Sequence, residues 1–221
     1  MKINKIIILA TTLFCIGLTG CRTISLKDID GNKYKTVTIG TQVWMAENLK
    51  TTKYNDGTPI PTVKENDEWA ALTTPGFCWY NNDSIDNKKT YGALYNWYTV
   101  STNKLCPTGW HVPSESEWAK ITTYLGEVGF AGDKLKESGT THWRTPNTGA
   151  TNESGFTALP GGYRSFEGIF NSIGIYGYWW SSTEYNSKTV LFWNLRYKYD
   201  RVYKYNSEKY CGFSVRCIMD H

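Results

Sequence analysis

The sequence predicts an α+β domain in which helices precede an antiparallel, aromatic-rich β-sheet. Three observations support this prediction. The 221 residues include 10 Trp, 16 Tyr and 20 Gly, a composition typical of a turn-rich body with an aromatic core. Helical spacing of apolar residues is confined to the first half of the chain. From Phe156 onward, short runs of Tyr, Trp, Val and Phe alternate with turn sequences, which is typical of an antiparallel meander.

The first 20 residues have the order of parts of a secretory signal peptide. Two lysines, Lys2 and Lys5, precede a short apolar run over residues 6–18. The stretch 18–21 resembles a lipobox, so we expect residues 1–20 to be removed, Cys21 to be lipidated and residues 21–27 to form a lipidated tether. A membrane-spanning anchor is the alternative, but such a span needs roughly 20 apolar residues and this run is shorter.

Export to the cell envelope sets the expected location and partners. We expect a lipid-anchored protein, in the outer membrane and either periplasmic or surface-exposed, with the membrane as one partner and a glycan or surface protein as the other. The formal charge of +4 falls to +2 without Lys2 and Lys5, which is too little to hold a nucleic acid through phosphate contacts. Residues 28–221 contain no stretch typical of a linker, so we expect one domain.

The first elements of that domain are predicted from turns and alternation. Along residues 33–39 two sets of side chains alternate, and the segment is bounded by turn residues 30–32 and by Gly40. This pattern indicates a strand, and residues 42–45 are expected to be its hairpin partner. A further turn is expected at residues 55–57, and a brief helix within 64–72.

Two main helices are predicted next. Tyr91, Leu94, Tyr95 and Tyr98 have the i, i+3, i+4, i+7 spacing of one helix face, and Thr90 could cap that helix. The second helix begins at Ser114, which forms a capping box with Glu117. Its buried stripe is expected to consist of Trp118, Ile121 and Leu125.

The sheet is predicted mainly from two later segments. In residues 190–199 the odd positions are apolar or aromatic and the even ones include Asn194, Arg196 and Lys198, so one face should pack and the other should meet water. Residues 212–218 should form the closing strand, with Phe213, Val215 and Cys217 on one side.

Four cysteines remain after Cys15 leaves with the signal and Cys21 takes lipid: Cys78, Cys106, Cys211 and Cys217. An even number of cysteines in an oxidising compartment predicts two disulfides, although four cysteines allow three pairings. A zinc site of four thiolates is the alternative, but the spacings lack the close CxxC pairs of such sites.

Several phrases of the sequence resemble one known family. They occupy residues 30–32, 42–49, 78–83, 91–98, 105–118, 159–164, 178–184 and 212–217. Together they resemble the family named for the major paralogous domain of Fibrobacter succinogenes, which occurs in exported and lipid-anchored bacterial proteins and has no assigned biochemical activity. The phrases cover nearly the whole of the mature chain.

A more distant similarity is to the C-type lectin fold and its relative, the formylglycine-generating sulfatase-modifying family. Residues 112–118 resemble a phrase that opens a helix in those proteins, and residues 212–217 resemble the end of their last strand. This resemblance implies a C-type-lectin-like domain whose closing strand is clipped to the helical region. It implies a pair of Cys106 with Cys217, which leaves Cys78 for Cys211.

Five residues are candidates for ligand binding: Arg164, Trp179, Trp180, Arg196 and Tyr203. Arginine beside tyrosine can hold a carboxylate or a hydroxyl-rich ligand by charged hydrogen bonds, and indole faces can stack on sugar rings. Neighbours on a strand point to opposite faces, so of the two tryptophans one is expected in the core and one at the rim. The alternative is that the tryptophans are packing residues and the arginines form cation–π pairs on a solvated strand face.

No cofactor is predicted. Residues 28–32 and 81–86 are rich in oxygen ligands, but neither completes a calcium loop, and the first fits a hairpin turn better. A structural calcium ion therefore has no supporting motif. His111 and His142 lack metal-ligand spacing, and no nucleophile motif is present. We therefore expect a lipid-anchored binding or adhesion module and not an enzyme. The alternative is an enzyme of the sulfatase-modifying type, which would use Cys211 and Cys217.

Overall fold

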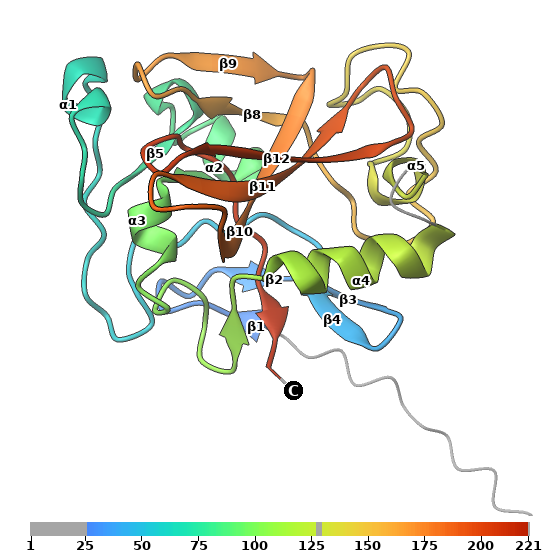
Figure 1. The fold of residues 1–221 in the computed structure, drawn as a ribbon, viewed down its shortest axis with the longest axis horizontal. Helices are drawn as coiled ribbons and strands as arrows, with labels where there is room; N and C mark the ends of the chain where they lie inside the picture. Colours follow the sequence, from blue (N-terminus) through green and yellow to red (C-terminus); the bar gives the residue numbers. More distant parts are fainter. Residues whose placement is uncertain (1–25, 127–129, 221) are drawn as a thin grey trace, which may run out of the picture.

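The computed structural model describes residues 26–126 and 130–220 (Figure 1). The predicted signal peptide at residues 1–20 and the predicted lipidation site Cys21 lie outside the described residues. Leu26–Lys27 form strand β1, so the last two residues of the predicted tether belong to the fold. Within the described ranges, no helix is long and apolar enough to cross a membrane.

The N-terminal strands lie at one pole of the molecule. Strand β1 pairs with β2 (Lys33–Tyr34) around the oxygen-rich turn at residues 28–32, which confirms that this segment is a hairpin turn. The predicted hairpin is also confirmed, as β3 (Thr36–Ile39) pairs with β4 (Gln42–Met45). These two strands continue into a four-stranded sheet of order β3-β4-β13-β7, completed by β13 (Ile218–Met219) and β7 (Trp110–His111).

The described helices are short with one exception: α1 (Asn66–Ala70), the 3-10 helix η1 (Tyr80–Asn82), α2 (Asn87–Tyr91), α3 (Trp97–Val100), α4 (Glu115–Gly126) and α5 (Gly132–Leu135). The capping box predicted for α4 is present, because the Ser114 backbone N–H donates to Glu117 Oε2 (2.8 Å) and the Glu117 N–H donates to Ser114 Oγ (3.4 Å). Its three predicted stripe residues are buried, so this helix is confirmed.

The prediction of a second main helix around residues 91–98 is wrong. Helix α2 stops before Gly92, whose φ of +73° lies in the left-handed region and whose absent Cβ would lie 2.7 Å from the Leu49 carbonyl oxygen. Residues Ala93–Tyr95 form strand β6, which pairs with β5 (Phe77–Trp79). The helical spacing arose because this short strand is buried on both faces, and Leu94 and Tyr95 lie in different core clusters.

The C-terminal half forms a five-stranded sheet of order β12-β11-β10-β8-β9. Its strands are β8 (Gly161–Arg164), β9 (Phe170–Ile173), β10 (Tyr176–Glu184), β11 (Thr189–Arg196) and β12 (Val202–Glu208). The predicted meander is confirmed for β10, β11 and β12, which pair antiparallel. The sheet as a whole is mixed, because β8 runs parallel to β10 where Gly162 meets Gly177.

Both faces of this sheet are packed, which corrects the one-sided prediction for residues 190–199. Trp193 and Leu195 pack with Trp118 of α4 in one core cluster. The even-numbered Val190 and Phe192 belong to a second cluster, which also contains Phe213, Val215 and Cys217, as predicted for the closing segment. The predicted closing strand at residues 212–218 is regular only at its end, where β13 (Ile218–Met219) begins. Residues 212–214 instead make isolated bridges to neighbouring strands.

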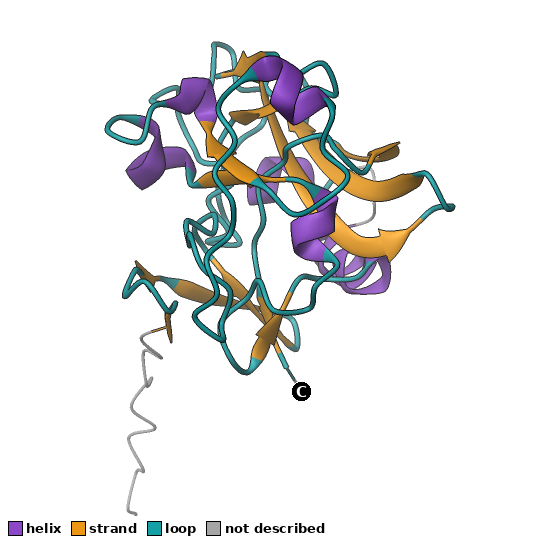
Figure 2. Cartoon of the chain, turned by 90° about the vertical axis from the view of Figure 1, so that its left-hand side faces the viewer, coloured by secondary structure: helices purple, strands orange, loops and turns teal. Residues whose placement is uncertain are grey.

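Different strands lie at the two ends of the molecule. Strands β8 and β9 lie at the top of Figure 1, and β1, β2 and the C-terminal end lie at the bottom. Figure 2, turned about the vertical axis, shows the first described strand and the C-terminal end at the same lower pole. The five-stranded sheet is therefore displaced from the point where the chain enters the fold.

Candidate functional site

Six side chains form what we call the tyrosine–arginine face of the five-stranded sheet: Tyr163, Tyr176, Tyr178, Arg196, Tyr203 and Tyr205. The register brings them together, because Tyr176 is the direct partner of Arg196, and Tyr178, Asn194 and Tyr203 form one row across three strands. Tyr163 of β8 extends this row, with its ring centroid 4.7 Å from that of Tyr178.

Arg196 lies at the centre of the exposed part of this face. Its Cζ is 4.2 Å from the Tyr203 ring centroid and 5.5 Å from those of Tyr176 and Tyr205. Its Nε donates to Asn194 Oδ1 (2.8 Å), and its Nη2 donates to Tyr205 Oη (3.1 Å). Among the described residues, no carboxylate forms an ion pair with Arg196 and Nη1 has no hydrogen-bond partner. The guanidinium is thus held in place with part of its hydrogen-bonding capacity unused.

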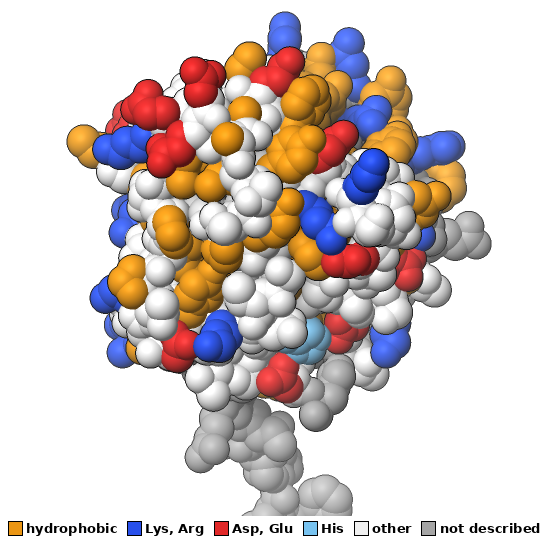
Figure 3. All heavy atoms as spheres, turned by 60° about the vertical axis from the view of Figure 1, so that its left-hand side comes forward, with side chains coloured by type: hydrophobic (Ala, Val, Ile, Leu, Met, Phe, Trp, Pro, Cys, Tyr) orange, Lys and Arg blue, Asp and Glu red, His pale blue; other side chains and the backbone are white. Residues whose placement is uncertain are grey.

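The tyrosines of the face combine solvent access with neutral hydroxyls. Tyr205 is 44% exposed, and Tyr176 and Tyr203 are half-buried. Burial raises the pKa of the Tyr178 and Tyr163 phenols, so both remain protonated donors at neutral pH. In the space-filling view of Figure 3, hydrophobic side chains lie among basic and acidic side chains over the upper part of the molecule. Such a surface offers ring area and hydrogen-bond donors to the same ligand.

Two of the five predicted ligand-binding residues, Arg196 and Tyr203, are brought together on this face. Arg164 is not, because it is fully buried between the rings of Trp69 (4.5 Å from Cζ to the centroid) and Phe170 (4.7 Å). Its guanidinium donates to backbone carbonyls of Val63 (2.7 Å), Lys64 (2.7 Å) and Gly168 (2.8 Å). The predicted ligand-binding role of Arg164 is therefore wrong, since every face of the group is covered.

The two predicted tryptophans are also unavailable to a ligand. Trp179 and Trp180 do point to opposite faces of β10, but both are in the core. The indole N–H of Trp179 donates to Asn48 Oδ1 (2.9 Å) and that of Trp180 donates to the Tyr95 carbonyl (2.7 Å). The expectation of one rim tryptophan is wrong because the sheet has a core on each side.

Sequence reasoning missed Tyr176, Tyr178 and Tyr205 as parts of the face. One signal was present for Tyr205, because it stands two positions after Tyr203 in an alternating strand and must share its side. No signal in the sequence places Tyr176 opposite Arg196, since that contact depends on the register of the β10–β11 pair.

Buried cations hold loops together elsewhere in the structure. Lys136 donates from Nζ to the carbonyls of Thr148 (2.8 Å), Tyr199 (2.8 Å) and Arg196 (3.4 Å), and thereby fixes the turn between β11 and β12. Burial lowers its pKa to about 8. Arg216 likewise donates to Asn48 Oδ1 and to the carbonyls of Phe156 and Thr157. Neutral acceptors therefore satisfy both cations.

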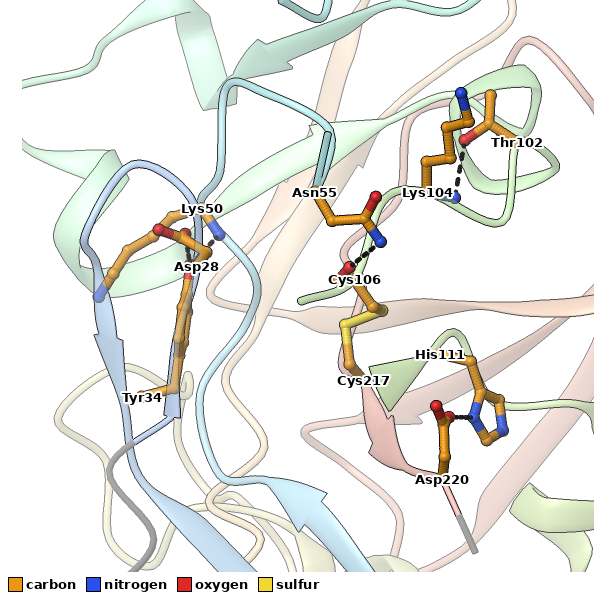
Figure 4. The surroundings of a disulfide bond; sticks show 10 residues. All are labelled: Asp28, Tyr34, Lys50, Asn55, Thr102, Lys104, Cys106, His111, Cys217 and Asp220. Atoms are coloured by element: carbon orange, nitrogen blue, oxygen red, sulfur yellow. Dashed lines mark hydrogen bonds and ion pairs between the residues drawn. A yellow bond between two sulfur atoms is a disulfide. The ribbon is translucent and has the colours of Figure 1, made fainter. Parts of the chain in front are cut away.

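The disulfide between Cys106 and Cys217 is present, which confirms the pairing implied by the resemblance (Figure 4). The second predicted disulfide is absent, because Cys78 and Cys211 are free thiols. They are buried in different core clusters, Cys78 beside Trp69 and Leu94, and Cys211 among residues that include Trp180 and Phe213. Burial raises the pKa of the Cys78 thiol to about 12 and that of Cys211 to about 11. Neither is a thiolate at neutral pH.

A histidine between two carboxylates lies near the disulfide (Figure 4). His111 Nδ1 is 2.6 Å from Asp220 Oδ1, and Nε2 is 2.9 Å from Glu117 Oε1. Partial burial lowers the pKa of His111, but the hydrogen bonds and charges of both carboxylates outweigh it and the net pKa is raised. The pair of contacts joins β7 to α4 and to the C-terminal segment. Across residues 26–126 and 130–220, no group of three or more His, Cys, Asp or Glu side chains is arranged to hold a metal ion.

Across the described residues, the fold and the site define a class of protein: an α+β fold with the Cys106–Cys217 disulfide, buried cations at its loop junctions and an aromatic–cationic sheet face. The chain belongs to the family described as Fibrobacter succinogenes major domain, whose model matches residues 37–219. This match confirms the family predicted from the phrases of the sequence. No curated protein and no solved structure matches the chain.

Proposed function

We propose that this chain is a lipid-anchored, extracytoplasmic binding or adhesion module that holds a glycan or a protein on its tyrosine–arginine face. The observation that carries the proposal is Arg196, which is fixed among three tyrosine rings and forms no ion pair with any described carboxylate. A cation that is ordered but unpaired at a surface is a ready partner for an anionic or hydroxyl-rich ligand.

The location in the cell envelope rests on the signal-like N-terminus and on Cys21. The Cys106–Cys217 disulfide supports it, because such bonds persist in oxidising compartments. A chain anchored at Cys21 would enter the fold at Leu26, at the pole opposite β8 and β9 (Figure 1). The anchored protein would then direct the upper part of the sheet away from the bilayer, in the periplasm or at the surface of the outer membrane.

The C-type-lectin-like fold belongs to the same proposal, with the clip of the closing segment by Cys106 as its support. Calcium has no part in it. The carboxylate of Asp28 already accepts hydrogen bonds from the Asn32 backbone N–H (2.9 Å), the Asn32 side chain (2.8 Å) and the Tyr34 hydroxyl (2.5 Å). Its oxygens therefore serve the hairpin turn.

An enzyme of the sulfatase-modifying type is less well supported than a binding module. That chemistry would need a reactive thiolate from Cys211 or Cys217. Cys217 is bonded to Cys106, and burial holds the pKa of Cys211 near 11. A buried thiol of that kind is inert at neutral pH.

Binding of the full chain, purified in detergent, to a glycan array and to a panel of purified surface proteins tests the proposal. The double variant Tyr203→Ala/Tyr205→Ala removes two rings of the face, and Tyr185→Ala is the matched control because Tyr185 is an exposed tyrosine away from Arg196. We expect the double variant to lose at least about tenfold in affinity for the bound ligand, since Tyr side chains dominate such contacts, and the control to keep it. Absence of any ligand, or equal loss in both variants, contradicts the proposal.

Mass spectrometry of the native chain tests the anchor separately. A mature N-terminus at Cys21 that carries acyl groups is the expected result. A native chain that still begins at Met1 without acyl groups contradicts the envelope location.

A further inference from the structure

We infer that the ligand of the tyrosine–arginine face is an acidic glycan, an oligosaccharide whose carboxylate binds Arg196 while its sugar rings lie against Tyr203 and Tyr205. This inference rests on the proposed function and specifies its ligand class. It depends on three properties of the face: its charge, its size and its rigidity.

The charge of Arg196 calls for an anion from outside the chain. Two exposed lysines pair with carboxylates, Lys104 with Asp56 (2.9 Å) and Lys204 with Glu115 (2.7 Å). Arg196 instead has only neutral partners, Asn194 and Tyr205, and its Nη1 is unused. A planar guanidinium with free N–H groups matches the geometry of a carboxylate, which it can bind with two hydrogen bonds.

The size of the face favours a glycan over a protein. A stable protein interface involves roughly 20–30 residues on each side, with an apolar centre. The tyrosines beside Arg196 with solvent access are few, and each ends in a hydroxyl: the half-buried Tyr176 and Tyr203 and the exposed Tyr205. Ring faces suit the C–H side of a sugar, and phenol hydroxyls suit its hydroxyl groups.

The face is rigid before any ligand arrives. Tyr203 and Tyr205 are two positions apart on β12 and their rings are nearly parallel, with an interplanar angle of 5° and centroids 6.1 Å apart. Strand β12 pairs with β11 over seven consecutive residue pairs, from Thr189↔Glu208 to Leu195↔Val202. Lys136 fixes the connecting turn through the carbonyls of Arg196 and Tyr199. Little conformational entropy is therefore lost on binding.

Calorimetric titration of the full chain in detergent tests this inference with three probes. They are a hexasaccharide of galacturonic acid, its carboxyl-reduced neutral counterpart and a hexaglutamate peptide. The protein variants are Arg196→Gln, Arg196→Lys and Arg201→Gln. The last is the matched control, because Arg201 is an exposed arginine at the same end of the sheet that contacts Phe130 and not the tyrosines.

We expect the acidic hexasaccharide to bind at least about tenfold more tightly than its neutral counterpart and the peptide. Arg196→Gln should remove that preference and Arg196→Lys should restore it in part, while Arg201→Gln should stay within about twofold of the parent. A melting temperature within 2 °C of the parent, on the order expected for a surface change, verifies that each variant is folded.

The other outcomes overturn either this inference or the proposed function. Equal binding of the acidic and neutral sugars, unaffected by Arg196→Gln, overturns the acidic class and leaves the binding module in place. Tighter binding of hexaglutamate than of the acidic hexasaccharide would show that the ligand class is an acidic peptide and not a glycan. If no probe binds and the glycan and protein arrays are also empty, the proposed function itself fails.

Discussion

Arg164 and Arg196 have similar aromatic neighbours but opposite surroundings. Arg164 lies between Trp69 and Phe170 and is fully buried, and Arg196 lies on Tyr203 at a surface. The guanidinium of Arg164 meets the carbonyls of Val63, Lys64 and Gly168, whereas that of Arg196 meets one amide and one phenol. An arginine packed on aromatic rings therefore stabilises the fold when backbone carbonyls accept its hydrogen bonds, and it is available to a ligand when they do not.

The buried cluster has the larger energetic effect on folding. Replacement Arg164→Met keeps much of the apolar volume but leaves several buried carbonyls without donors. We expect a loss of about 3–5 kcal/mol in the free energy of unfolding, since each unsatisfied buried group costs roughly 1–3 kcal/mol. Urea unfolding measures it, with Arg196→Gln as the control. Equal, small losses for the two arginines would remove the distinction between them.

Lys136 connects the two regions, because it is buried like Arg164 and holds the turn that carries Arg196. Lys136→Met should cost about 2–4 kcal/mol of stability through its unpaired carbonyls and should also weaken ligand binding. Thermal unfolding and titration with the acidic hexasaccharide measure the two effects. Lys134→Met, at a partly exposed neighbour that pairs only with Glu153 (3.9 Å), is the control and should change neither. A stable Lys136→Met protein with full affinity would show that the turn needs no cation.

His111 offers a smaller, pH-dependent test of a charge that is paired, unlike that of Arg196. Its pKa in the fold is raised above the ordinary value of 6.5. The stabilisation is thus fully present below pH 6.5 and is lost as the pH rises through the raised folded-state pKa. We expect about 0.5 kcal/mol, because partly exposed pairs are screened by solvent. Melting curves of the parent and of His111→Gln between pH 5.5 and about pH 8.5 should converge at the upper end. Parallel curves would exclude this contribution.

The smallest effect on stability is expected at the exposed cluster itself. Arg196→Gln should change the free energy of unfolding by less than about 0.5 kcal/mol, since the glutamine amide nitrogen can still donate to the buried Asn194 Oδ1 and the exposed Tyr205 hydroxyl can turn to water. Chemical denaturation of the parent and the variant measures the difference. A loss above about 2 kcal/mol would place Arg196 among the structural arginines.

Local patterns in the sequence predicted those parts of the structure that depend on local chemistry. The capping box of α4, the hairpin of β3 and β4 and the turn at residues 28–32 follow from neighbouring residues, and the structure has all three. The closing disulfide was implied by a family resemblance and is also present.

The errors arose where burial depends on distant segments. Residues 93–95 are a strand buried on both sides, and the same arrangement makes both Trp179 and Trp180 core residues. No local pattern reveals that β8 comes beside β10 and that residues 63–66 supply acceptors to Arg164. Two of the six side chains of the candidate face, Arg196 and Tyr203, were predicted as ligand-binding residues, and the positions of the tyrosines on β8 and β10 depend on register.

If the chain is anchored and holds a ligand as proposed, the Cys106–Cys217 bond would limit how far the protein extends under load. Tension entering at Leu26 and leaving through a ligand on Tyr203 would then pass across the disulfide, which closes a loop of sequence separation 111. Tyr203 is only 14 residues before Cys217, so this short segment limits how far the ligand-holding half can be drawn out. Residues 26–105 lie outside the loop that the disulfide closes. The disulfide would thus limit the extension of the segment that carries the proposed ligand-binding face.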